Sequence, residues 1–391
     1  MADWAHAALD RPDAWGDLVT GRRIGVVTTA ASRSLEGSGT GPGKRPALGR
    51  RTDTVLAEAG ATVARLFSPE HGLEGTLDPG ESGGDSAGDD GVPVISLYGP
   101  RRRPEQRHLA DLDAVVIDLP DAGCRAYTFS ATMLGVAAAA AEAGVPAIVL
   151  DRPNPLGRTA AGPGLADERT AFVAPMNVPL RHGLTMGEMA MRDARERDYA
   201  PPTVIRCDWQ GNPCPADAIW MPPSPGLPTS ETAFGYAGTV LFEGTNISEG
   251  RGTTRPFLTV GAPFLSGEAL NDKLAQTPLV GIDHWPITFR PAFFKHQGVL
   301  CGGIALHIAD RRRADPIALV VRLFAAIARL APDDVTASAF LERLSGGDDA
   351  RRILLHGADP DEVLETWRIQ ATDFRRHRTA ILLYPDDEAP P

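Results

Sequence analysis

Strand-like and helix-like segments alternate along the first 150 residues, and this alternation constrains the fold more than any other feature of the chain. Five short runs rich in β-branched or other apolar residues have the length of strands: 23–28, 62–67, 92–97, 113–118 and 145–150. Helical stretches at 52–59 and 128–143 lie between them, and a glycine suited to a helix C-terminus follows each one. Because strands that alternate with helices form right-handed βαβ units, we predict an α/β fold with a Rossmann-like parallel sheet.

A proline-rich stretch at residues 220–228 divides the chain. Beyond it, helical and strand-like patterns are mixed: helices are expected at 267–274, 316–330, 335–344 and 360–370, and strands at 287–289 and 303–308. We therefore predict two domains, a Rossmann-like domain over residues 1–229 and a smaller α+β C-terminal domain over residues 230–391.

The turn after the first predicted strand argues against a nucleotide cofactor. Residues 27–32 read VTTAAS and lack the G-x-G-x-x-G pattern, whose glycines let a pyrophosphate approach a helix N-terminus. The four cysteines have no CxxC spacing and no HExxH pattern occurs, so the sequence predicts no metal site. We expect a protein that works without cofactors.

Charge and targeting signals bear on partners and location. With 39 Lys and Arg residues against 50 Asp and Glu residues, the formal net charge is −11, which disfavours nucleic acids and anionic membranes as partners. No apolar segment is long enough to span a bilayer, and the N-terminus lacks the features of a signal peptide. We predict a cytoplasmic protein with reduced cysteines. If a leader precedes this sequence, we predict secretion instead, with a Cys207–Cys214 disulfide as an option.

Polar residues gather directly after three of the predicted strands. In an open parallel sheet the carboxyl ends of the strands share one edge, where ligands bind. Each such residue alone more often caps a helix or forms a turn, but three clusters at one edge favour a binding site. The candidates are Glu70 and His71 after the second strand, Asp118, Asp121, Arg125 and Tyr127 after the fourth, and Asp151, Arg152 and Asn154 after the fifth.

Two further segments carry candidate site residues. Arg181 and His182 precede Thr185-x-x-Glu188, a capping box that predicts a helix start and structural roles for its two residues. Residues 241–257, LFEGTNISEGRGTTRPF, combine glycines with carboxylates and arginines. We interpret them as a substrate loop at the domain interface rather than a core element. The candidates there are Glu243, Asn246, Glu249, Arg251, Thr253 and Arg255.

Several motifs together resemble the exo-β-N-acetylmuramidase family (NamZ-like, glycoside hydrolase family 171). They are FSPEHGLEG, VPVISLYG, IDLPDAGCRAYTFSATM, LDRPNPLG, PLRHGLTMGEMA, MPPSP and LFEGTNISEGRGTTRPF, in this order from about residue 23 to beyond residue 310. SPEHG combined with EGTNxSEGRGTTRPF is highly specific. The chain departs from the family pattern in three places. DLPD at 118–121 replaces a DIQD-type segment, and AYTF at 126–129 replaces a tyrosine-rich segment. PSPGLP at 223–228 replaces PSPNMP.

The resemblance implies an activity and a site. It implies a Rossmann-like domain that holds the catalytic centre and a smaller C-terminal domain that completes the cleft. The suspected catalytic glutamate of the family lies in SPEHG and maps onto Glu70. The implied reaction is exo-acting hydrolysis that releases β-linked N-acetylmuramic acid from the non-reducing ends of peptidoglycan fragments in cell-wall turnover. The implied partner is therefore a peptidoglycan-derived sugar.

Glycoside hydrolysis generally needs a proton donor and a second group on the opposite face of the sugar. We expect Glu70 to be the general acid. Three sources for the second group stay open: the adjacent strand end with Asp118 and Asp121, the facing loop with Glu243 and Glu249, or the N-acetyl group of the substrate. Two carboxyl groups about 5–5.5 Å apart would indicate retention, and about 6.5–9.5 Å would indicate inversion.

The lactyl carboxylate distinguishes muramic acid from glucosamine, and its recognition calls for a fixed cation such as the arginine fork. The candidates for this role are Arg125, Arg181, Arg251 and Arg255.

Three other functions compete with this interpretation. An esterase or amidase would use His71 or His182, but no G-x-S-x-G elbow lies near a predicted strand end. A metal-dependent hydrolase would combine His71 with Asp118 and Asp121, which lack a recognised ligand spacing. A non-catalytic peptidoglycan-sugar binding protein would keep the same site and bind without turnover.

Overall fold

A seven-stranded sheet in the first half of the chain organises the fold. The computed structural model describes residues 6–36, 47–88, 90–165, 170–277 and 279–386. The strands of this sheet are β1 (Arg23–Val27), β4 (Thr62–Ser68), β5 (Ser86–Ala87), β6 (Pro93–Ser96), β7 (Ala114–Ile117), β8 (Ala147–Leu150) and β9 (Thr203–Ile205). Six strands are parallel in the order β6-β4-β1-β7-β8-β9, and β5 pairs antiparallel with β6 at one edge. This is the strand order of a Rossmann-type doubly wound sheet, which confirms the predicted fold class.

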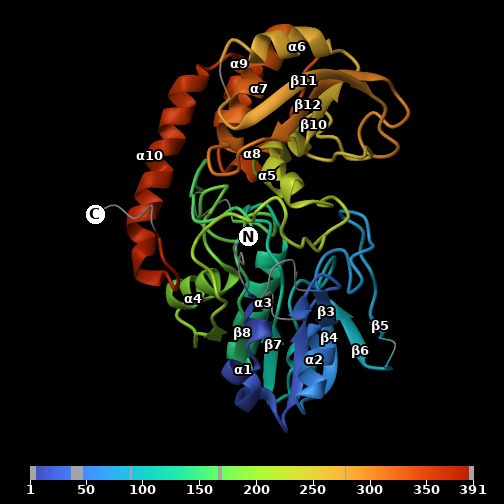
Figure 1. Cartoon of the computed structure of the whole chain (residues 1–391), viewed down its shortest axis with the longest axis vertical. Helices are drawn as coiled ribbons and strands as arrows, with labels where there is room; N and C mark the ends of the chain where they lie inside the picture. The colour runs from blue at the N-terminus through green and yellow to red at the C-terminus, as the bar shows by residue number, and fades with distance from the viewer. Residues whose placement is uncertain (1–5, 37–46, 89, 166–169, 278, 387–391) are drawn as a thin grey trace, which may run out of the picture.

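Helices cover both faces of the sheet (Figure 1). They are α1 (Pro12–Val19), α2 (Thr52–Glu58), α3 (Phe129–Glu142) and α4 (Met186–Glu196). Successive side chains of a strand point to opposite faces. In β7, Ala114 and Val116 pack on the side of α1 and α2, whereas Val115 and Ile117 pack on the side of α3 and α4. Because both faces are buried, the strand sequence is a continuous apolar run.

The predicted helices of this half are confirmed, with small shifts at their ends. α2 ends before Gly60 and α3 ends before Gly144, and both glycines have the positive φ that is common beyond a helix C-terminus. A hairpin of β2 (Arg33–Glu36) and β3 (Ala47–Arg51) lies between β1 and α2. The sequence did not predict this hairpin.

The second half forms an α+β lobe around an antiparallel sheet of order β10-β12-β11. Its strands are β10 (Thr259–Ala262), β11 (Ile282–Phe289) and β12 (Cys301–Ile308), and its helices are α5 (Ser230–Thr239), α6 (Gly267–Leu274), α7 (Pro316–Leu330), α8 (Ala339–Ser345), α9 (Asp349–His356) and α10 (Pro360–Arg378). The predicted bounds of α6 and α7 are confirmed. α8 begins later than predicted because Ser338 caps it, and α10 extends beyond the predicted end at residue 370.

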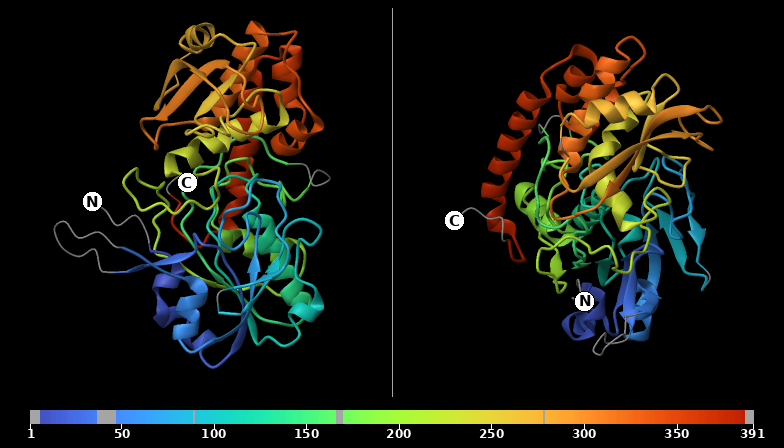
Figure 2. Two further views of the ribbon diagram at one scale, coloured as in Figure 1. Left: turned by 90° about the vertical axis from the view of Figure 1, so that its right-hand side faces the viewer. Right: turned by 45° about the horizontal axis from the view of Figure 1, so that its top comes forward.

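One hydrophobic core runs through both lobes. Phe234 and Phe257 of the second lobe belong to the same buried cluster as Ile117 of the sheet. The domain boundary proposed between residues 229 and 230 falls at the N-cap of α5. α10 runs alongside both lobes, and the short helical turn that follows it, Thr379–Ile381, contacts α4 (Figures 1 and 2). The end of the described chain therefore packs on the first lobe.

Candidate active site

Glu70 lies just beyond the carboxyl end of β4 and is fixed by donors from separate segments. Gly80 N donates to Oε1 at 3.0 Å, and Thr128 Oγ1 donates to Oε2 at 2.6 Å. Tyr98 is a third neighbour: burial, together with the adjacent Glu70 carboxylate, raises the pKa of Tyr98 to about 12. Glu70 is only 7% exposed. The carboxyl group is therefore held in a defined position that is largely shielded from water.

His71 follows Glu70 in a strained conformation with φ of 71°. Its Nδ1 lies 2.8 Å from Leu77 O, so Nδ1 carries the proton and donates it to this carbonyl. Burial lowers the pKa of His71, and the positive charge of Arg251 acts in the same direction. The ring is therefore neutral near pH 7.

Asp121 and His182 form a buried pair beyond the end of β7. Asp121 Oδ2 lies 3.1 Å from His182 Nε2, and Oδ1 accepts from Ala122 N at 2.8 Å. Because Leu184 N donates to His182 Nδ1 at 3.1 Å, the ring proton belongs on Nε2, on the side of Asp121. Oδ2 makes no well-aligned hydrogen bond within the described residues. This buried oxygen therefore keeps the capacity to accept a proton or a hydrogen bond.

Tyr127 lies in the loop after β7, between Asp121 and Thr128, the residue that donates to Glu70. Burial raises the pKa of Tyr127 well above its usual value, and the charges of Asp121 and Glu70 both add to the effect. The ring packs at 4.6 Å from Phe129 and meets Tyr236 of α5 edge to face at 6.3 Å. Because the loop after β7 supplies both Asp121 and, through Thr128, a hydrogen bond to Glu70, we group the two carboxyl groups in one candidate site.

The second lobe contributes a cluster of charged residues, largely from residues 241–257. Arg251 donates to Glu243 Oε1 from Nε at 3.0 Å and from Nη2 at 2.7 Å. Lys295 Nζ donates to Glu249 Oε2 at 2.7 Å, and Arg251 Nε lies 3.7 Å from Glu249 Oε1. Burial raises the pKa of Glu243, and Arg251 opposes this shift. Two cations thus balance two carboxylates.

Residues 241–257 are anchored in the core, whereas their composition predicted a loop outside it. Phe242, Ile247 and Phe257 have no exposed surface, and Glu249 is 1% exposed. The apolar side chains anchor the segment in the core, and its carboxylates tolerate burial because cations neutralise them. Our prediction for residues 241–257 was wrong in this respect.

Asp118 lies where the strand order reverses, between β1 and β7, and both of its oxygens are engaged. Arg152 donates from Nε to Oδ1 at 2.5 Å and from Nη2 to Oδ2 at 2.8 Å. Thr52 Oγ1 also donates to Oδ2 at 2.5 Å. Asp118 has no exposed surface. The structure therefore does not support a catalytic role for Asp118 or a substrate contact for Arg152. Instead, the pair occupies the edge where Rossmann folds hold nucleotide phosphates.

Asp151 and Asn154 are also engaged in holding the chain together. Asp151 Oδ2 accepts from Thr185 Oγ1 at 2.7 Å and from Tyr384 OH at 2.6 Å. Burial raises the pKa of Asp151 to about 6, and these hydrogen bonds oppose the shift. Asn154 Nδ2 donates to Leu184 O at 2.8 Å. Both residues have no exposed surface, and the contacts that they make here are within the protein.

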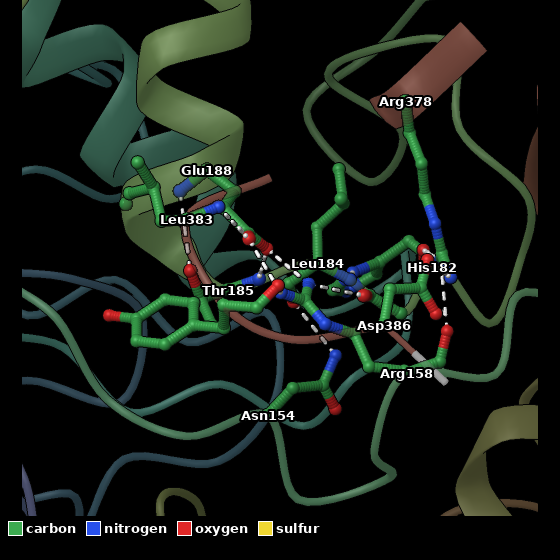
Figure 3. A network of polar contacts seen from close by, with 12 residues as sticks. Asn154, Arg158, His182, Leu184, Thr185, Glu188, Arg378, Leu383 and Asp386 are labelled. Atoms are coloured by element: carbon green, nitrogen blue, oxygen red, sulfur yellow. Dashed lines mark hydrogen bonds and ion pairs between the residues drawn. The ribbon is translucent and has the colours of Figure 1, made fainter. Parts of the chain in front are cut away.

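A buried ion pair joins the chain after residue 378 to the loop that carries His182 (Figure 3). Arg158 donates to Glu188 Oε2 at 2.6 Å and Oε1 at 2.8 Å, and Leu383 N donates to Oε1 at 2.7 Å. The predicted capping box of Thr185 and Glu188 at the start of α4 is confirmed. Arg378 Nη1 lies 3.5 Å from His182 O, so the network also holds the backbone of a site residue.

Three observations on the described residues concern metal binding, membrane-spanning helices and disulfide formation. No group of three or more His, Cys, Asp or Glu residues suited to a metal ion occurs in the part of the chain that the structure describes. Among the described helices, none has the length and apolarity required to cross a bilayer. All four cysteines are buried and free, so the optional Cys207–Cys214 disulfide is not formed.

Two family models match nearly the whole chain. The model for the N-terminal part of exo-β-N-acetylmuramidase NamZ matches residues 25–231, and the model for its C-terminal part matches residues 234–384. The chain belongs to the NamZ family. It is 34% identical over 372 residues to the peptidoglycan β-N-acetylmuramidase NamZ of Bacillus subtilis (strain 168), which covers 93% of this chain and 87% of that protein.

Solved structures of two DUF1343 family proteins from Bacteroides fragilis NCTC 9343 share the fold of this NamZ family member. One has a TM-score of 0.85 at 27% identity, over 98% of this chain and 100% of that protein. The other has a TM-score of 0.75 at 26% identity, over 98% of this chain and 99% of that protein. The two-lobe arrangement therefore extends to experimentally determined structures.

Three of the four arginines considered for the lactyl carboxylate have other partners in this NamZ family member. Arg125 donates to three backbone carbonyls. Arg181 donates to a backbone carbonyl and packs against the ring of Phe234. Arg255 donates to a carbonyl of β12 at 2.6 Å. Arg251 differs from these three, because it pairs with the partly buried Glu243 and its charge acts to lower the pKa of His71.

Asn246 and Thr253 shape the backbone around Arg251. Asn246 Nδ2 donates to Asp334 O at 2.8 Å, and its Oδ1 accepts from Thr336 N at 2.9 Å. Thr253 Oγ1 donates to Gly250 O at 2.6 Å. The structure thus gives both predicted contact residues roles within the protein.

Sequence reasoning missed three side chains that the site uses. Thr128 and Tyr98 contact Glu70, and Lys295 neutralises Glu249. Tyr98 follows the end of β6, so the rule that selected polar residues after strands would have found it. Lys295 lies in the loop between β11 and β12, where nothing in the NamZ family motifs or the periodicity marks it.

Proposed function

We propose that this chain is an exo-acting glycoside hydrolase that releases terminal β-linked N-acetylmuramic acid from peptidoglycan fragments during cell-wall turnover and recycling. The observation that carries this proposal is the 2.6 Å hydrogen bond from Thr128 to Glu70, which brings the loop that carries Asp121 to Glu70 in a NamZ family member. The Bacillus subtilis relative is named a peptidoglycan β-N-acetylmuramidase. The direct test is release of nitrophenol from para-nitrophenyl β-N-acetylmuramide beside the matching N-acetylglucosaminide. We expect the muramide to be hydrolysed far faster than the glucosaminide, and binding without turnover would favour a sugar-binding protein instead.

Glu70 is the proton donor in this proposal. As the bond between the anomeric carbon and the leaving oxygen breaks, the Glu70 carboxyl group protonates that oxygen. Gly80 N, Thr128 Oγ1 and Tyr98 hold both carboxyl oxygens in place. Fixed donors of this kind reduce the reorganisation that the reaction requires, because the group need not be oriented anew in each cycle.

Asp121 is the second carboxyl group. Its Oδ2 keeps accepting capacity, and His182 Nε2 lies 3.1 Å away on the same side. In the proposed reaction, a water molecule attacks the anomeric carbon and transfers a proton to Asp121. We do not assign this role to Asp118, because Arg152 engages both of its oxygens.

This assignment predicts the stereochemistry of the product. A base that activates water gives direct displacement, so the first N-acetylmuramic acid released from the β-linked substrate is expected to be the α anomer. Proton NMR spectra recorded within the first turnovers, before mutarotation, would show which anomer forms. Initial formation of the β anomer would instead give Asp121 the role of nucleophile or of a group that orients the substrate N-acetyl amide.

Arg251 is the proposed cation for the lactyl carboxylate. Within the described residues its Nε and Nη2 bind Glu243, and no hydrogen bond from Nη1 is present. A Cβ at position 226 would lie 2.6 Å from Nη1, so a glycine there leaves room for the guanidinium. A charge-assisted hydrogen bond from Nη1 would add affinity for muramic acid that glucosamine cannot gain.

Substitution of Gly226 by alanine is expected to reduce discrimination between the two sugars. The added methyl group displaces Nη1, so kcat/KM for the muramide should fall about tenfold or more, while the low rate on the glucosaminide stays unchanged. Gly347→Ala provides the control, since a Cβ there meets no atom within 4 Å. Parallel loss on both sugars would show that Nη1 does not contact the lactyl group.

A further inference from the structure

The loop between β11 and β12 presents two adjacent aromatic rings to solvent. Phe293 is 44% exposed and Phe294 is 45% exposed, and their rings meet edge to face at 5.9 Å. Residues 290–300 are called the platform loop below. Neighbouring exposed aromatic rings forgo the stabilisation that burial gives, and such patches commonly mark binding surfaces.

The platform loop holds Phe294 in a strained conformation. Phe294 has φ of 66° and His296 has φ of 57°, values that non-glycine residues rarely adopt. Such strain persists where surrounding contacts fix it, and it concentrates at ligand sites. Here Lys295 Nζ donates to Phe242 O at 2.7 Å and Ile247 O at 3.0 Å. His296 Nε2 lies 2.6 Å from the backbone oxygen of Asn246.

Contacts join the platform loop to the proposed site. Ala292 N donates to Gly252 O at 2.8 Å, which places the loop against the segment that carries Arg251. The Arg251 guanidinium lies 4.7 Å from the centre of the Phe257 ring and 5.5 Å from that of Phe294. Phe294 is therefore the exposed partner of the cation proposed to bind the lactyl group.

We propose that Phe294 is a stacking platform for the second sugar of the substrate, the N-acetylglucosamine that leaves. This inference rests on the proposed function. The sugar that is cleaved must reach carboxyl groups that are 7% exposed, so the rest of an exo-enzyme's substrate extends toward solvent, where Phe294 lies. The face of an aromatic ring is electron-rich and attracts the weakly positive C–H groups on one face of a pyranose.

Binding to an inactive enzyme tests the proposal. In the Glu70→Gln background, calorimetry gives the Kd of the disaccharide N-acetylmuramyl-β-1,4-N-acetylglucosamine and of free N-acetylmuramic acid. Phe294→Gly removes the ring and also relieves the positive φ, so loss of binding cannot be ascribed to a strained fold. We expect the disaccharide to bind about tenfold more weakly while the affinity for the single sugar stays the same. Phe294→Trp should restore the affinity for the disaccharide.

The controls separate this proposal from others. Trp285, 40% exposed on β11 and stacked near Arg255, offers a matched aromatic ring, and Trp285→Ala should leave both affinities unchanged. Equal weakening of both sugars, or unchanged disaccharide binding by Phe294→Gly, would overturn the platform role. A change in size on gel filtration with unchanged sugar affinity would identify the patch as a contact between copies of this chain, which also overturns it. If neither sugar binds and the wild type does not turn over the muramide, the proposed function itself fails.

Discussion

Replacement of Glu70 by glutamine is expected to lower kcat on the disaccharide by about 10²- to 10⁴-fold and to leave KM nearly unchanged. Glutamine has the same shape, and its oxygen still accepts a hydrogen bond from Gly80 N or Thr128 Oγ1, so the local structure should persist. The amide has no acidic proton to give to the leaving oxygen. Steady-state kinetics of N-acetylglucosamine release measures the effect.

The leaving group decides whether the loss reflects an acid. Nitrophenolate leaves without being protonated, so Glu70→Gln should retain much more of its activity on para-nitrophenyl β-N-acetylmuramide than on the disaccharide. Glu74→Gln serves as control, because Glu74 lies in the same motif but is exposed and pairs with Arg51. If both substrates lose the same factor in Glu70→Gln, Glu70 is essential for another reason than proton donation.

Selecting the polar residues that follow predicted strands gave the members of the proposed site but could not rank them. It selected Glu70 and Asp121, which the loop after β7 brings into one candidate site, and it selected Asp118 equally. The carboxylate of Asp118 differs because Arg152 and Thr52 donate hydrogen bonds to it. Both residues come from distant parts of the sequence. A carboxylate that follows a strand therefore shows where a site can form, while its partners, visible only in the fold, determine whether it remains available.

The fold was more predictable than the site because its signals are local. β7 has the continuous apolar run of a strand covered on both sides, and α3 ends at a glycine, so short segments suffice to predict both. Residues 241–257 show the opposite case. Their charges suggested exposure, yet Lys295 from the platform loop neutralises Glu249 and permits its burial. No local pattern indicates that this lysine lies there.

Removal of the Arg158 side chain is expected to cause the largest loss of stability. Glu188 has no exposed surface, and Arg158→Ala would leave its charge buried without the bidentate partner. Breaking a buried pair from one side typically costs about 3–5 kcal/mol, more than replacing both partners with apolar residues. The Arg158 guanidinium also stacks at 4.9 Å over the ring of Trp209, a contact that is lost too. Urea unfolding followed by tryptophan fluorescence measures the change.

The loss should begin at the end of the chain. Leu383 N donates to Glu188 and Tyr384 O accepts from Arg158, so the segment after α10 loses both anchors (Figure 3). Hydrogen exchange at the Leu383 amide should therefore accelerate before the central sheet opens. Arg368→Ala is the matched control, because Arg368 pairs with Glu365 on the exposed surface of α10 and such exposed pairs contribute little to stability. If the two variants are equally stable, the Arg158–Glu188 pair does not hold residues 379–386 against the first lobe. The network around His182 must then depend on the hydrogen bond of Tyr384 to Asp151 instead.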